Sequence, residues 1–161
     1  MLLRNLSELP PLLHKNQRLL GLDYGSVVIG VAVSDPNRRV ASPIGSITRK
    51  KFATDSAALS SLMRDRDIGA IIIGLPKNMD GSEGASAQAA RAFIRNFLAT
   101  TPTPDLPVLL WDERLSTAAI ERFLISDDMT RKRRDEVVDK AAAAYILQGA
   151  LDALGHLPPA P

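Results

Sequence analysis

Residues 18–35 read RLLGLDYGSVVIGVAVSD and give the clearest indication of the fold. An apolar run ends at Asp23, Tyr24 to Ser26 follow as a turn, and a second apolar run begins at Val27. Two such runs separated by a short turn that contains glycine are typical of a β-hairpin. The sequence therefore predicts two neighbouring strands, with a carboxylate at the point where the first strand ends.

Further strands and helices follow this hairpin along the chain. Residues 44–48 can supply a third strand, and residues 52–66 carry apolar side chains at helical spacing. Residues 70–75 are apolar throughout, as expected for a strand that is buried on both faces of a parallel sheet. The other expected elements are a helix over 82–98, a strand over 108–111, a short helix over 117–124 and an alanine-rich helix over 135–154. This order predicts an α/β fold in which helices flank a mixed sheet of five strands.

The length and composition of the chain fit a single domain. With 161 residues, of which 45% are hydrophobic and 24% charged, the chain can bury a core without disulfides. We expect the domain to span residues 17–155, with an N-terminal tail at 1–16 and a C-terminal tail at 156–161. No apolar run is long enough to cross a bilayer, and residues 1–16 lack a continuous signal-peptide core. We therefore expect a cytoplasmic protein without a membrane partner.

The residue types present restrict the kind of metal site that the chain can form. The sequence contains no cysteine, which excludes disulfides, thiol catalysis and thiolate ligands. Its two histidines, His14 and His156, lie in or beside the expected tails, and we interpret both as exposed surface residues. A bound metal would therefore be held by oxygen ligands, which hard divalent cations prefer.

Acidic residues occur where the expected strands end. Asp23 closes the first strand, Asp112 and Glu113 close the last one, and Asp139 lies near the start of the alanine-rich helix. Ligand sites in open α/β sheets lie beyond the carboxyl ends of the strands, and clustered carboxylates repel one another unless a cation lies among them. Two divalent ions at such a site can promote phosphodiester cleavage. Taken singly, an acid at such a position is more often a helix cap, an ion-pair partner or a solvated side chain than a metal ligand.

Basic residues accompany these acids in the sequence. Lys77 lies in the loop between the strand at 70–75 and the next helix, where free N–H groups favour an anion. Ordinary turn and cap chemistry explains this loop equally well. The densest basic stretch, Arg131, Lys132, Arg133 and Arg134, directly precedes the helix that carries Asp139. Such a run is usually a solvated surface, but beside a metal site it would attract a phosphate backbone and make binding sensitive to salt.

In their order along the chain, these motifs resemble the YqgF/RuvX family. The matching segments are GLDYG at 21–25, IGVAVSD at 29–35, GLP at 74–76, NMDGS at 78–82, DERLST at 112–117, VD at 138–139, AA at 141–142 and ILQ at 146–148. The resemblance extends from about residue 18 to residue 154. In one departure, Val28 stands where the family often has a basic residue, which argues against a phosphate contact at that position.

The resemblance implies an RNase H-like fold and a nuclease that depends on Mg²⁺ or Mn²⁺ and matures the 5′ end of pre-16S rRNA. It assigns the acidic site to Asp23, Asp139 and the Asp112–Glu113 position, and it places Lys77 and Arg114 beside the substrate groove. RNA in ribosomal precursor particles is then the expected partner of a monomer or homodimer. Two alternatives remain: a dimeric enzyme that resolves four-way DNA junctions, and a non-catalytic ribosome-assembly or transcription factor.

We expect Glu113, rather than Asp112, to complete the catalytic and metal-binding set with Asp23 and Asp139. In the sheet order that the resemblance implies, the strand at 70–75 lies beside the first strand and offers no acid at its end. The missing ligand must then reach in from the next strand, about 4.8 Å farther across the sheet. Glutamate has an extra methylene for this reach, and alternation places Asp112 and Glu113 on opposite faces.

Overall fold

A six-stranded mixed sheet lies at the centre of the structure, a computed structural model that describes residues 1–103, 105–112 and 131–159. For residues 131–140 the description covers the backbone alone. The strands are β1 (Leu2–Leu3), β2 (Arg18–Tyr24), β3 (Val28–Ser34), β4 (Ala41–Thr48), β5 (Ile68–Leu75) and β6 (Val108–Asp112), and the helices are α1 (Phe52–Asp65), α2 (Ala85–Thr100) and α4 (Arg131–Gly155). No helix in these ranges is long and apolar enough to cross a membrane. The helix expected over residues 117–124 lies outside the described residues.

The sheet confirms the strands that the apolar runs predicted. Its order is β1-β6-β5-β2-β3-β4. β2 and β3 form the antiparallel hairpin, with Leu22 opposite Val31, whereas β5 runs parallel to both β2 and β6. All eight residues of β5 are buried, because helices cover both faces of this part of the sheet.

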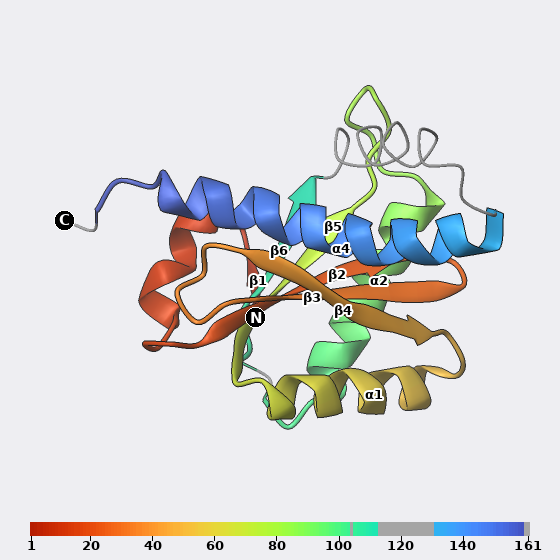
Figure 1. The fold of residues 1–161 in the computed structure, drawn as a ribbon, viewed down its shortest axis with the longest axis horizontal. Coiled ribbons are helices and arrows are strands. Elements are labelled where there is room, and N and C mark those ends of the chain that lie inside the picture. The colour runs from red at the N-terminus through yellow and green to blue at the C-terminus, as the bar shows by residue number, and fades with distance from the viewer. Residues whose placement is uncertain (104, 113–130, 160–161) are drawn as a thin grey trace.

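Helices lie on both faces of the sheet, so the fold has three layers (Figure 1). α1 and α2 cover one face, where Leu22, Ile73 and Phe97 belong to the same core cluster. α4 covers the other face, where Leu19 and Leu147 belong to a second cluster. Because successive strand residues point to opposite faces, odd-numbered residues of β2 face α4 and even-numbered ones face α1 and α2.

The first 16 residues differ from the tail that we expected, since they pack against the domain. β1 extends the sheet to six strands by pairing in parallel with β6, and the backbone N–H of Val108 donates to the Met1 carbonyl at 2.9 Å. Two 3₁₀ turns follow, at Leu6–Glu8 and Pro10–Leu12. Between them Leu9 is fully buried in the cluster beneath α4. Leu3 and Leu9 therefore bury apolar surface that a solvated tail would leave exposed.

Candidate active site

Asp23 lies one residue before the end of β2, on the face that α4 covers. It is partly exposed and pairs with Gly30 of β3. Two residues earlier, Gly21 approaches α4 so closely that a Cβ at this position would lie 2.7 Å from the Leu147 Cβ and 2.9 Å from the Ala143 carbonyl oxygen. Strand alternation places Asp23 on the same face as Gly21. Asp23 is therefore at the margin where the sheet meets α4.

The direction of α4 follows from a polar contact near its carboxyl end. The side chain of Gln148 accepts a hydrogen bond from the Ala41 N–H at 2.8 Å and donates one to the Arg39 carbonyl at 2.9 Å. Ala41 pairs with the last residue of β3, at the end of the sheet where β2 begins. α4 therefore runs opposite to β2, and its first turns lie toward the carboxyl end of that strand (Figure 1).

This direction carries the backbone of residue 139 toward the end of β2 that bears Asp23. Asp139 precedes Ala143 by one helical turn, which is about 6 Å along the helix axis. Asp23 follows Gly21 by two residues, which is about 6.6 Å along the strand. Because Gly21 and Ala143 are in contact and α4 runs opposite to β2, both steps lead toward the carboxyl end of β2. Two of the three acids chosen from the sequence thus belong to segments, the end of β2 and the amino-terminal part of α4, whose backbones lie toward the same end of the sheet.

The end of β6 lies two strands away from Asp23. The register places Gly74 of β5 opposite Trp111 and Leu75 opposite Asp112. Trp111 faces α4, because its Nε1 atom lies 3.2 Å from the place where a Cβ on Gly149 would be. Asp112 follows Trp111 and therefore lies on the opposite face of the sheet from Asp23. Glu113 and Arg114 lie outside the described residues.

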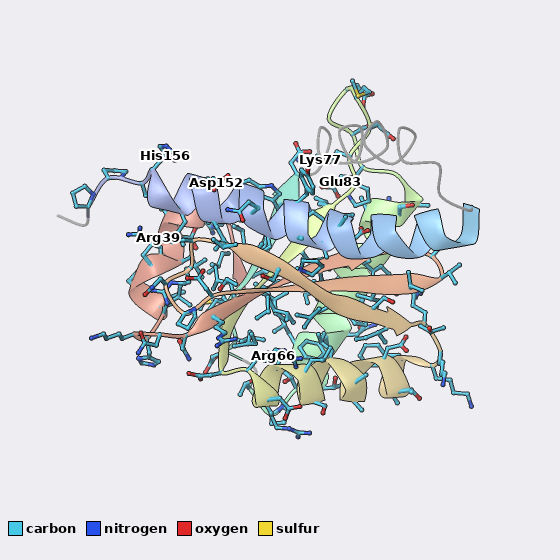
Figure 2. The ribbon with its side chains drawn as sticks, viewed as in Figure 1. Arg39, Arg66, Lys77, Glu83, Asp152 and His156 are labelled. Atoms are coloured by element: carbon cyan, nitrogen blue, oxygen red, sulfur yellow. The ribbon has the colours of Figure 1, made fainter. Side chains whose placement is uncertain are left out.

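Lys77 lies in the loop that connects β5 to α2, and contacts within the loop hold it in place. It forms an isolated antiparallel bridge with Glu83, which lies beside it (Figure 2). The Glu83 carboxylate accepts two hydrogen bonds of 2.7 Å from the Arg91 guanidinium. These hydrogen bonds are the main reason why the pKa of Glu83 lies below its ordinary value, with a smaller contribution from the charge of Lys77. The two ends of the loop are therefore held together at Lys77 and Glu83, and Lys77 carries a positive charge beyond the end of β5.

Arg49 was not selected from the sequence, although it contacts the turn that follows Asp23. Its Nη1 atom donates to the carbonyls of Gly25 and Ser26, at 3.0 and 3.1 Å. It follows Thr48, the partner of Val28, in the register of β3 and β4. No local motif could have revealed this contact, because Arg49 is about two dozen residues from the carbonyls that it binds.

The acids at this edge of the sheet suit a hard divalent cation better than a softer metal. His14 and His156 are exposed, as expected, and both lie at the other end of the sheet, near the start of β2 and beyond the end of α4. The chain has no cysteine, so the available donors near Asp23 are oxygen atoms. No group of three potential metal-binding side chains occurs within the part of the chain that the structure describes. Glu113 and the side chain of Asp139 fall outside that part.

Comparison with known proteins gives consistent matches over most of the chain. The sequence model of a family described as "RuvX: Holliday junction resolvase" matches residues 17–153. A protein of Rhodospirillum centenum named "Putative pre-16S rRNA nuclease" is 57% identical over 159 residues, which cover 96% of this chain and 83% of that protein. A protein of Phenylobacterium zucineum with the same name is 54% identical over 154 residues, covering 95% and 97% of the two chains.

Among solved structures, T. thermophilus RuvC in complex with a Holliday junction substrate has a similar fold. The TM-score is 0.51 at 11% sequence identity, and the match covers 86% of this chain and 96% of RuvC. At this low identity the comparison concerns the fold alone. It confirms the RNase H-like α/β fold that the motifs implied.

Proposed function

Since this chain belongs to the RuvX family, we propose that it is a metal-dependent endonuclease that hydrolyses phosphodiester bonds and matures the 5′ end of pre-16S rRNA. The observation that carries the proposal is the close contact of α4 with Gly21, two residues before Asp23, in a direction that leads the helix backbone at residue 139 toward the carboxyl end of β2. The names of the relatives favour RNA as the substrate. The protein would then act in the cytoplasm, on ribosomal precursor particles, as a monomer or homodimer.

We assign Asp23, Glu113 and Asp139 as the residues that hold the divalent ion. Mg²⁺ or Mn²⁺ bound there would supply Lewis-acid stabilisation of the phosphate charge and an activated water. Asp23 is suited to this role because it is paired with Gly30 of β3 and directly follows Leu22, which is paired on both sides, with β3 and β5. α4 packs closely on Gly21, and this contact holds the helix, which carries Asp139 about one turn earlier than Ala143, against the sheet.

Basic residues on both sides of this edge would bind the phosphate backbone of the substrate. Lys77 is held beyond the end of β5 by the bridge to Glu83. The first turn of α4 contains Arg131, Lys132, Arg133 and Arg134. This run ends five residues before Asp139, or about 7.5 Å along the helix axis. We propose that Lys77, Arg114 and this basic run flank the RNA as it crosses the acidic site.

Replacing the four residues of the basic run with glutamine should weaken RNA binding and reduce its salt dependence. The slope of log affinity against log salt should fall by about 0.7 for each single-strand phosphate contact that is lost. Filter binding over a range of salt concentrations measures this slope, and cleavage at saturating RNA should change little. Replacing Arg64 and Arg66, near the end of α1, with glutamine is the control, because it removes two positive charges at a place away from the proposed RNA path. An unchanged slope would show that the basic run is only a solvated surface.

The proposed activity is tested directly by incubating the purified full-length chain with precursor 16S rRNA and, separately, with a four-way DNA junction. We expect cleavage of the rRNA precursor near its mature 5′ end, only when Mg²⁺ or Mn²⁺ is present. The Asp23→Asn variant, purified in parallel, controls for contaminating nucleases. Cleavage that survives exhaustive treatment with EDTA would contradict metal dependence.

The same assay separates the two alternative functions. Cleavage of the DNA junction with no cleavage of the rRNA precursor would identify a junction-resolving enzyme, which the description of the family favours. Binding of the rRNA precursor without cleavage in either metal would instead identify an assembly factor that retains the fold for binding. Each of these results would overturn the proposed rRNA-processing activity.

A further inference from the structure

The turn between β2 and β3 begins one residue after Asp23, where β2 ends at Tyr24, so its geometry helps to fix the end of the strand that carries Asp23. The Gly25 N–H donates to the Val28 carbonyl at 3.0 Å and to the Asp23 carbonyl at 3.2 Å. A Cβ on Gly25 would lie 2.6 Å from the Val28 carbonyl oxygen, a distance that real Cβ contacts do not reach. The turn is therefore tight and admits little variation at Gly25.

Arg49 contacts every residue of this turn from Tyr24 to Val27. In addition to its two hydrogen bonds to the Gly25 and Ser26 carbonyls, its backbone N–H donates to the Val27 carbonyl at 2.9 Å. Its guanidinium carbon lies 4.4 Å from the centre of the Tyr24 ring, within the range of a cation–π interaction. One residue, through its side chain and its backbone, thus connects the end of β4 to the whole segment that follows Asp23.

The Tyr24 ring is also fixed by the core on the α1 and α2 side of the sheet. It stacks on Phe93 of α2, with ring centres 4.7 Å apart, and Phe93 in turn contacts Phe52 and Phe97. Tyr24 and Asp23 are neighbours on one strand, so their side chains point to opposite faces of the sheet, and the orientation of one is coupled to that of the other through the shared backbone. A fixed Tyr24 therefore restricts the direction of the neighbouring Asp23.

We propose that Arg49 is a positioning residue for Asp23: it clamps the Tyr24–Val27 turn so that the Asp23 carboxylate is directed toward the divalent-ion site beside α4. The proposal rests on the metal site of the proposed function. Arg49 is poorly suited to binding phosphate instead, because its Nη1 atom already serves two carbonyls. Its Nε atom is buried and has no hydrogen-bond partner among the described residues.

A positioning role and a purely electrostatic role predict opposite changes in metal affinity. A nearby positive charge disfavours a divalent cation, so removal of the Arg49 charge by itself would strengthen ion binding. Loss of the clamp would instead let the Asp23 carboxylate move and would weaken ion binding. Residues that orient a metal ligand typically contribute about 10- to 100-fold to metal affinity. The sign of the change therefore distinguishes the two roles.

The test compares Mn²⁺ binding to the full-length wild-type chain and to the Arg49→Met variant by isothermal titration calorimetry. We expect the variant to bind Mn²⁺ about 10-fold more weakly, and its turn amides at 24–28 to exchange hydrogen faster. Arg49→Lys keeps the charge and the contact with the Tyr24 ring, but its ammonium ends one bond short of the position of Nη1, so we expect an intermediate affinity. If the methionine variant folds poorly, the comparison of Mn²⁺ affinity is made between the wild-type chain and the lysine variant.

Arg38→Met provides a matched control at the other end of the sheet. The Arg38 guanidinium also donates to a backbone carbonyl, that of Gln17, at 2.7 Å, but it is far from the turn after Asp23. Equal weakening of Mn²⁺ binding in both methionine variants, or unchanged or tighter binding in Arg49→Met, would overturn the positioning role. A wild-type chain that binds no Mn²⁺ would overturn the metal site itself, and the two failures are thereby distinguished.

Discussion

Replacement of Asp23 with asparagine is expected to lower metal-dependent cleavage by about 1,000-fold or more. Loss of a carboxylate ligand removes several kcal/mol of transition-state stabilisation by the ion, and about 4 kcal/mol corresponds to a 1,000-fold change in rate. Asparagine has nearly the same shape, so packing at the end of β2 should be preserved. Single-turnover cleavage of precursor rRNA at saturating Mn²⁺ measures this effect without a contribution from substrate binding.

The same variant should be as stable as the wild-type protein, or somewhat more stable, when no metal is present. Removing one of several clustered negative charges relieves their mutual repulsion in the metal-free state. Thermal melts in the presence of EDTA measure the change. A large fall in melting temperature would show that the Asp23 carboxylate is mainly a structural partner.

Asp35→Asn is the matched control for this experiment, because Asp35 is an acid with a structural role. Its carboxylate accepts hydrogen bonds from the backbone N–H groups of Asn37, Arg39 and Val40, and the bond from Val40 contributes most to the lowering of its pKa. A lowered pKa means that the ionised carboxylate stabilises the folded state above its ordinary pKa, and that this stability is lost as pH falls. The control should reduce stability at neutral pH and leave cleavage at saturating Mn²⁺ near the wild-type rate.

The central strands were predictable because burial leaves a direct trace in the sequence. The continuous apolar run at 70–75 can only be accommodated in a strand that is covered on both faces, and β5 is such a strand. Alternation in β2 likewise predicts which residues share a face with Asp23. The helix that covers this face was predicted from its alanines, which allow close approach to the sheet at Gly21.

The edges of the sheet were harder to predict, because rules for central strands fail there. The third strand was expected to begin at Ile44, whereas β4 begins at Ala41 and includes Pro43. Proline lacks an N–H donor, but an edge strand tolerates this loss on its outer side. Likewise, residues 1–16 were interpreted as a tail, and the burial of Leu9 depends on tertiary contacts that no local pattern encodes.

Some residues of the candidate site could be predicted from local sequence, whereas others could be identified only from tertiary contacts. Asp23 could be selected from the sequence because a charge directly after an apolar run is unusual and costly. Arg49 could not be selected, since its partners are backbone carbonyls and an aromatic ring on another strand. Backbone acceptors are present at every position, so they leave no sequence signature. Contacts of this kind become visible only when the register of β3 and β4 is known.

The second large effect concerns Glu113, which we expect to be essential, whereas Asp112 should not be. The strand order supports this expectation, because β5 lies beside β2 and β6 lies one place farther out. β5 ends at Leu75 without an acid. A ligand from β6 must therefore span two strand spacings, or about 9.6 Å between strand axes. Gly74, the residue of β5 beside this path, has no side chain to obstruct it.

Strand alternation favours Glu113 independently of its length. Trp111 faces α4 and contacts Gly149, whereas Leu110 packs on the core cluster of the opposite face. Asp112 then faces the same side as Leu110, away from Asp23, and a residue 113 that continued the alternation would face α4. An aspartate at position 112 could reach the site only if the backbone of β6 turned inward.

Glu113→Gln should therefore lower the rate of single-turnover cleavage by about 1,000-fold, the same effect as expected for Asp23→Asn, because each substitution removes one carboxylate ligand. Asp112→Asn should remain within about 10-fold of the wild-type rate, because losing a surface polar contact costs about 1 kcal/mol or less. Both substitutions remove one negative charge while nearly preserving side-chain shape, so each is the matched control for the other. Mn²⁺ affinity, measured on the same preparations, should fall for Glu113→Gln alone. If Asp112→Asn instead abolishes cleavage while Glu113→Gln stays active, β6 must turn inward after Trp111, and the argument from reach and alternation is wrong.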